Sequence, residues 1–139
     1  MSHISKIELV IQSLGDLKEA CQKLGFEFVE NQKTFKWYGR WVGDTPIPEG
    51  IKIEDIGKCD HAIRVPGCTY EVGIIKRGEH YILLWDYYSA GGLEPKIGPN
   101  AGKIKQAYTV ARVKKKARIK GYRIREKQID QGVRLVLTV

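Results

Sequence analysis

The chain has 139 residues, a mass of 15.8 kDa and a net charge of +8, with 42% hydrophobic and 29% charged residues. This length fits one domain, which buries enough apolar surface to fold without a metal or a disulfide, so we expect residues 1–139 to form a single domain. A membrane-spanning chain is excluded, because the longest strongly apolar run, residues 81–85, is far shorter than the ~20 residues required.

Alternating apolar residues predict a strand at residues 3–11, and Ser13 is placed to cap a helix that follows. Residues 26–30 resume the alternation as a second strand, after Gly25 has ended the helix. The helix itself has one apolar stripe at the spacing i, i+3, i+4, i+7: Leu17, Ala20, Cys21 and Leu24. The first thirty residues therefore predict a β-α-β unit.

Glycine and proline residues interrupt residues 39–58, which predicts a long loop with at most a short edge strand. A strand is expected at residues 61–65. Residues 69–75 and 80–85 flank Arg77-Gly78, which predicts a β-hairpin. A second Gly/Pro-rich loop is expected at residues 89–102.

A long helix is expected from residue 102 to residue 120, followed by two closing strands at residues 122–128 and 133–138. The stretches LGFEFVE (24–30) and KGYRIRE (120–126) both show a helix end, a glycine, an aromatic residue and an alternating strand. We therefore expect an α+β fold, a mostly antiparallel sheet with two helices on one face. The internal parallel suggests a ferredoxin-like duplication.

Several sequence blocks, in this order along the chain, resemble a known family: MSHISKI, LKEACQKLGFEF, DHAIRVPGCTYEVGI, YILLWDYY, GLEPKIG, QAYTVARVKKKARIKGY and GVRLVLTV. The chain is similar to the bacterial and plastid domain of unknown function numbered twelve fifty-seven, whose plastid members are the Ycf thirty-five reading frames. The resemblance covers nearly the whole chain and implies neither a cofactor nor a reaction. The chain departs from the family in its longer Gly/Pro-rich stretch at 39–58 and in its more basic last helix.

The cysteines and one pair of histidines are the candidate metal ligands. Cys59, His61 and Cys68 lie within ten residues, and His80 follows. Zinc prefers such ligands as short-spaced pairs on turns, and the spacing here does not match that pattern. Buried thiols are the favoured interpretation. The odd number of cysteines also argues against a disulfide framework, and we expect no bound metal.

No catalytic signature is present in the sequence. The stretch GPNAGKI at 98–104 lacks the spacing and the hydroxyl of a P-loop, so no cofactor is expected. Asp86 closes an apolar strand, where burial would perturb it, although such a residue more often binds backbone N–H groups. A non-catalytic role is favoured, and an enzyme with a site near Asp86, Cys59 and His61 stays an alternative.

Two surfaces are candidates for a partner. One is the aromatic segment that contains Trp37 and Trp41, which would indicate a partner site if these side chains are exposed. The other is the basic C-terminal region. Residues 1–100 carry 12 basic and 14 acidic residues, a net −2, whereas residues 101–139 carry 12 basic and 2 acidic residues, a net +10.

A helical wheel of residues 103–120 gives one polar face that contains Lys105, Arg112, Lys116 and Lys120, opposite an apolar stripe that runs from Ile104 to Ile119. Lys115 falls within the apolar arc. The positive charge continues onto the closing strands at Arg123, Arg125, Lys127 and Arg134. A solvated helix surface would also explain this pattern, in part through the helix dipole.

We therefore expect a binding or adaptor module whose basic helix face contacts a protein or another anionic partner, with no membrane partner. An RNA- or DNA-binding protein and a small enzyme are the alternatives. Lys6 and Glu8 interrupt the N-terminal segment where a signal peptide needs unbroken apolar residues. A cytoplasmic location is expected, or the stroma for a plastid-encoded chain.

Overall fold

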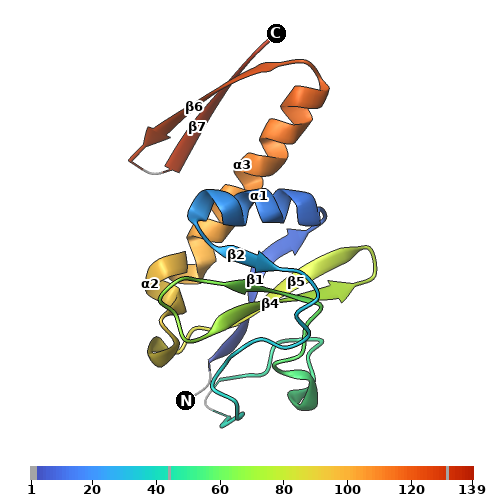
Figure 1. Ribbon diagram of the computed structural model, residues 1–139, viewed down its shortest axis with the longest axis vertical. Helices are drawn as coiled ribbons and strands as arrows, with labels where there is room; N and C mark the ends of the chain where they lie inside the picture. Colours follow the sequence, from blue (N-terminus) through green and yellow to red (C-terminus); the bar gives the residue numbers. More distant parts are fainter. Residues whose placement is uncertain (1–2, 44, 131) are drawn as a thin grey trace.

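The structure is a computed structural model that describes residues 3–43, 45–130 and 132–139. Five antiparallel strands form the main sheet in the order β1-β5-β4-β3-β2, and two further strands form a separate hairpin (Figure 1). The strands of the main sheet are Ile4–Ile11 (β1), Glu27–Val29 (β2), His61–Arg64 (β3), Glu71–Arg77 (β4) and His80–Asp86 (β5). The hairpin strands are Arg123–Ile129 (β6) and Gly132–Thr138 (β7).

Two long helices pack against one face of the main sheet, which confirms the predicted α+β class. The long helices are Leu14–Leu24 (α1) and Gly102–Ile119 (α3), and a short helix, Leu93–Ile97 (α2), lies between them in the chain. Short 3-10 turns lie at Ile53–Asp55 (η1), Ser89–Gly91 (η2) and Pro99–Ala101 (η3). As the sequence predicts, the hydroxyl of Ser13 accepts a hydrogen bond from the Asp16 N–H at 3.2 Å, and Gly25 ends α1 with φ 77°.

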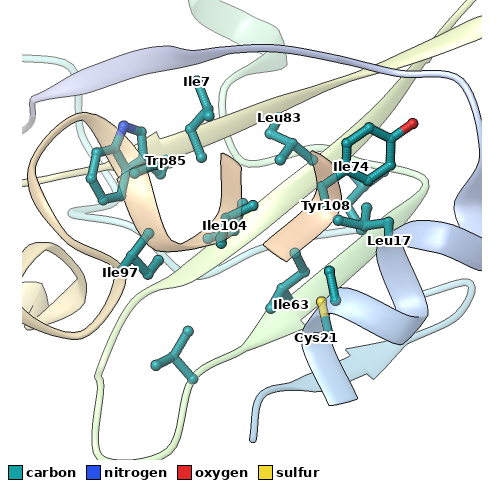
Figure 2. Packing of buried hydrophobic residues seen from close by; sticks show 14 of the residues in the cluster. Ile7, Leu17, Cys21, Ile63, Ile74, Leu83, Trp85, Ile97, Ile104 and Tyr108 are labelled. Carbon is teal, nitrogen blue, oxygen red and sulfur yellow. The ribbon is translucent and has the colours of Figure 1, made fainter. Parts of the chain in front are cut away.

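The larger core lies between the sheet and the helices. Figure 2 shows Leu17 and Cys21 of α1 and Ile104 and Tyr108 of α3 directed toward sheet residues such as Leu83. The hydroxyl of Tyr108 accepts hydrogen bonds from the backbone N–H groups of Gln12 and Ser13, at 2.9 and 3.3 Å. The bonds join the start of α1 to the middle of α3, and so fix where the two helices cross.

A second core lies on the other face of the sheet, under the long loop between β2 and β3. Phe35 of this loop packs directly on Gly73 of β4, where any side chain would overlap the Phe35 ring. Ile51 and Ile56 of the same loop are also buried. The loop predicted from its glycines and prolines therefore acts as a packed layer that covers half of the sheet.

Two buried carboxylates fasten this loop to the sheet. Asp86, which is fully buried, accepts hydrogen bonds from the backbone N–H groups of His3, Tyr38 and Tyr88 at 2.9–3.0 Å. Glu71 accepts from the backbone N–H of Lys36 at 3.0 Å and also binds the side chains of Gln32 and Arg64. Backbone N–H groups satisfy the Asp86 carboxylate, so its burial does not leave an unpaired charge.

The ferredoxin-like duplication is not found. In a duplication the strand after the second helix would join the main sheet, but within the described part of the chain β6 pairs only with β7. The local resemblance of the two helix-glycine-strand stretches is real, and it leads to strands in two different sheets.

The predicted loop at 89–102 also contains a short helix, α2, because Leu93 and Ile97 lie one turn apart and are both fully buried.

The last turns of α3 extend beyond the core. Ile119, predicted to be on the apolar stripe, is 77% exposed, and Lys115, predicted within the buried arc, is exposed as well. Figure 1 shows α3 running past α1 and away from the main sheet, so the sheet does not cover Ile119 in its last turn. The wheel fails here because helical periodicity does not reveal where the packing neighbours of a helix end.

The contact between Gly73 and Phe35 gives a stability test. We expect Gly73→Ala to lower the free energy of unfolding by about 1–3 kcal/mol, because the new methyl group must displace the Phe35 ring. Gly15→Ala is the matched control, since its nearest neighbour, the Ser13 hydroxyl, would be 3.7 Å from the new Cβ. Urea denaturation measures both, and equal stability of the two variants would contradict the packing.

Candidate partner-binding surface

The predicted basic face of α3 is divided by its surroundings. Lys105 lies in an open cleft of about 550 Å³ between β1 and the segment from α2 to α3. Lys6, Glu8 and Glu94 line the same cleft. Two lysines and two glutamates therefore balance in charge there, and Lys105 is not part of an uncompensated basic surface.

Arg112 is bonded within the protein. Its guanidinium donates to Asp16 at 3.3 Å and to the side chain of Gln12 at 3.2 Å. Asp16 is only 3% exposed, so this pair is largely shielded from water. Arg112 thus joins α3 to the start of α1, a structural role that the helical wheel does not reveal.

Four of the remaining basic residues, in the last turns of α3 or just after it, fall into two groups. Lys114 and Arg118 form ion pairs with Glu126 and Glu19, respectively. Lys116 and Lys120 are exposed, and no described residue forms an ion pair with either of them. The sequence predicts four residues on the basic face of α3. Of these, Lys116 and Lys120 are the two whose charge no neighbouring acid of the described residues compensates, and both lie at the end of α3.

The hairpin carries four further exposed basic residues. Arg123 and Arg125, both predicted from sequence, alternate along β6 with residues that face α3. Lys127 and Arg134, which are predicted to extend this positive charge along the hairpin, share their exposed face. The alternation of the closing strands around a glycine turn is the signal that identifies them, because residues i, i+2 and i+4 of a strand lie on one face.

The aromatic segment lies elsewhere. Trp37 and Trp41 are half-buried and pack on the second core, under the loop that covers the sheet. A Cβ at Gly57 would be 2.6 Å from the ring nitrogen of Trp37, so this indole is tightly enclosed on one side. Figure 1 places the loop at the end of the molecule opposite the hairpin. The two surfaces predicted from sequence therefore do not merge into one.

The candidate metal ligands do not converge. Cys59 belongs to the core under the loop, whereas Cys68 packs against the core on the helix side. Their thiols donate to the carbonyl oxygens of Gln32 and Gly92, respectively. Within the described residues, no group of three or more histidine, cysteine or acidic side chains is arranged to hold a metal ion.

The buried reactive groups are held in unreactive states. Burial raises the pKa of Cys21 to about 12 and the pKa of Cys59 to about 11, so both thiols stay protonated at neutral pH. Asp86, Glu71 and Asp16 are engaged in the structural hydrogen bonds described above. The strongly buried groups thus serve the fold.

No protein-family model, curated protein or solved structure matches the chain. Among the described residues, no helix is both long enough and apolar enough to cross a bilayer. The functional argument therefore depends on the geometry and charge of the chain itself. The feature with the clearest chemical meaning is the end of α3 together with the hairpin β6–β7, which we call the cationic unit.

The free energies of unfolding of two variants distinguish the structural role of Arg112 from the exposed position of Lys116. We expect Arg112→Gln to lower the free energy of unfolding by about 1–3 kcal/mol, because the Asp16 carboxylate would remain buried without its cation. Lys116→Gln should change it by less than about 0.5 kcal/mol, as is usual for an exposed site. Thermal and urea unfolding measure both, and equal effects would contradict the assignment.

His61 provides a test by pH. Its Nδ1 accepts a hydrogen bond from the Asn31 N–H at 3.0 Å, and burial between Phe28 and Tyr81 lowers its pKa from 6.5. The unfolded chain then binds a proton at His61 more readily than the folded chain does. The free energy of unfolding therefore falls as the pH drops through the pKa that His61 has in the unfolded chain.

His61→Gln keeps an acceptor for Asn31 and removes the titration. We expect the wild type to lose more stability than this variant between about pH 7.5 and about pH 5. The measurement is the difference in free energy of unfolding at several pH values. A difference that does not depend on pH would show that His61 titrates alike in both states.

Proposed function

We propose that this chain is a non-catalytic binding module whose cationic unit holds an anionic macromolecule. The observation that carries the proposal is the distribution of ion pairs. Three basic residues in the second half of α3 pair with acids of other elements: Arg112 with Asp16, Lys114 with Glu126 and Arg118 with Glu19. Lys116 and Lys120 at the end of α3, and the hairpin residues Arg123, Arg125, Lys127 and Arg134, form no ion pair within the described residues.

Electrostatics favours an external partner for this charge. Residues 101–139 have a net charge of +10, and Glu126, one of their two acids, is already shared by Lys23 and Lys114. A helix that is only solvated normally alternates acidic and basic residues at i, i+4, which relieves repulsion. Concentrated charge of one sign attracts a partner of the opposite sign and speeds its association.

A non-catalytic role is supported by the state of the reactive groups. Asp86 is enclosed by three backbone N–H groups, and burial keeps the thiols of Cys21 and Cys59 protonated. None of these groups is presented to a substrate. We also propose membership of the domain family numbered twelve fifty-seven, which rests on the ordered sequence blocks and carries no activity of its own.

Retention on a heparin column tests whether the position of the charge matters. The triple variant Lys116→Gln/Lys120→Gln/Arg123→Gln removes three charges from the cationic unit. The control Lys33→Gln/Lys52→Gln/Lys76→Gln removes three charges from exposed positions on the body of the protein. We expect the first variant to elute at lower salt than the control, which has the same net charge. Elution of both at the same salt concentration would contradict the proposal.

A further inference from the structure

The hairpin β6–β7 has two chemically different faces. Glu126, Gln128 and Val133 face the helices: Glu126 binds Lys23 and Lys114, and the other two line a cavity of about 370 Å³ against α1 and α3. Because side chains alternate along a strand, the neighbouring residues point away from the protein. This outer face consists of Arg123, Arg125, Lys127 and Ile129 on β6 and Arg134, Val136 and Thr138 on β7.

The outer face has four cations, no acid and no ion pair among the described residues. Lys127 and Arg134 are directly opposite each other in the register. Like charges in this position destabilise a strand pair, and nothing on the same face relieves them. The protein therefore carries a local cost that its own fold does not compensate, and that an external anion would remove.

The spacing of these cations fits a polyanion. Arg123, Arg125 and Lys127 follow each other at every second residue of β6, about 6.8 Å apart at the usual rise of a strand. A polymer with regularly spaced negative charges can contact all three at once, and nucleic acids have one phosphate per nucleotide. An isolated acidic side chain or a small anion could use only one or two of them.

The composition and width of the hairpin β6–β7 favour a nucleic-acid duplex over a single-stranded nucleic acid. Neither β6 nor β7 contains an aromatic residue, and single-stranded nucleic acids are held largely by stacking of bases on aromatic side chains. Two paired strands are about 4.8 Å apart, and the major groove of B-form DNA, about 12 Å wide, admits such a ribbon. The major groove of A-form RNA is too deep and narrow for side chains to read.

The geometry points to the hairpin β6–β7 as a DNA-binding ribbon, whose outer face enters the major groove of duplex DNA. Arg123, Arg125, Lys127 and Arg134 contact phosphates and base edges, and Val136 provides an apolar contact between them. Lys120, at the base of the ribbon, reaches the backbone beside the groove. This inference rests on the proposed function, because it names the macromolecule that the cationic unit holds.

Fluorescence anisotropy with a labelled DNA duplex of about 20 base pairs, measured over a series of salt concentrations, tests the inference. The ribbon variant Arg125→Gln/Lys127→Gln/Arg134→Gln is compared with Lys33→Gln/Lys52→Gln/Lys76→Gln, which has the same net charge. We expect the ribbon variant to bind at least about tenfold more weakly, with a salt slope reduced by about 2–3, because each lost phosphate contact removes about 0.9. The control should bind like the wild type.

The outcomes separate this inference from the function on which it rests. Equal binding by the ribbon variant and the control would overturn it, as would tighter binding of duplex RNA or of single-stranded DNA than of duplex DNA. If DNA does not bind but the heparin column still distinguishes its two variants, the assignment of DNA to the hairpin is wrong and the proposed binding of an anionic macromolecule by the cationic unit stands. Circular dichroism checks the fold of the ribbon variant, which should be at least as stable as the wild type because the Lys127–Arg134 repulsion is gone.

Discussion

The fold depends on one arrangement, a sheet covered on its second face by a loop that two buried carboxylates hold in place. A loop of about thirty residues usually lies on the surface, because its backbone polar groups need partners. Here Asp86 and Glu71 supply acceptors to N–H groups of the loop from the ends of adjacent strands. Phe35 then reaches Gly73 and closes the second core. The small sheet thereby gains an apolar layer on each face, which a chain of this length could not otherwise provide with two long helices.

The molecule separates its structural charges from its unpaired ones. Arg112 and Asp16 join the two helices, and the buried acids bind the loop, so the buried charges of the body are used internally. The end of α3 extends beyond the core, and its Lys116 and Lys120 have no such partners among the described residues. Positive charge can accumulate there without disturbing the packing, because exposed residues have little effect on the free energy of folding. A surface with this freedom is where a fold can acquire a binding function at small cost in stability.

Local patterns in the sequence predict most of the elements, and they fail where the outcome depends on distant residues. The cap at Ser13, the end of α1 at Gly25 and the β4–β5 hairpin follow from nearby residues. The bond from Arg112 to Asp16 spans 96 positions of sequence, and no helical wheel contains it. The exposure of Ile119 and the balanced cleft around Lys105 depend likewise on which elements are neighbours in space. That Lys127 and Arg134 share one face with Arg123 and Arg125 follows from strand alternation in the last hairpin, which is a local pattern.

Glu126 connects the cationic unit to the body. A hairpin of two strands is marginally stable by itself, and Glu126 is the acid through which β6 bonds to both Lys23 of α1 and Lys114 of α3. These hydrogen bonds lower the pKa of Glu126. The bonds of the charged carboxylate to Lys23 and Lys114 are therefore lost only as the pH falls through that lowered pKa. Because Glu126 alternates with Arg125 and Lys127, its inward bonds orient the cations outward. The one acid within the basic strand therefore determines which way its positive charges point.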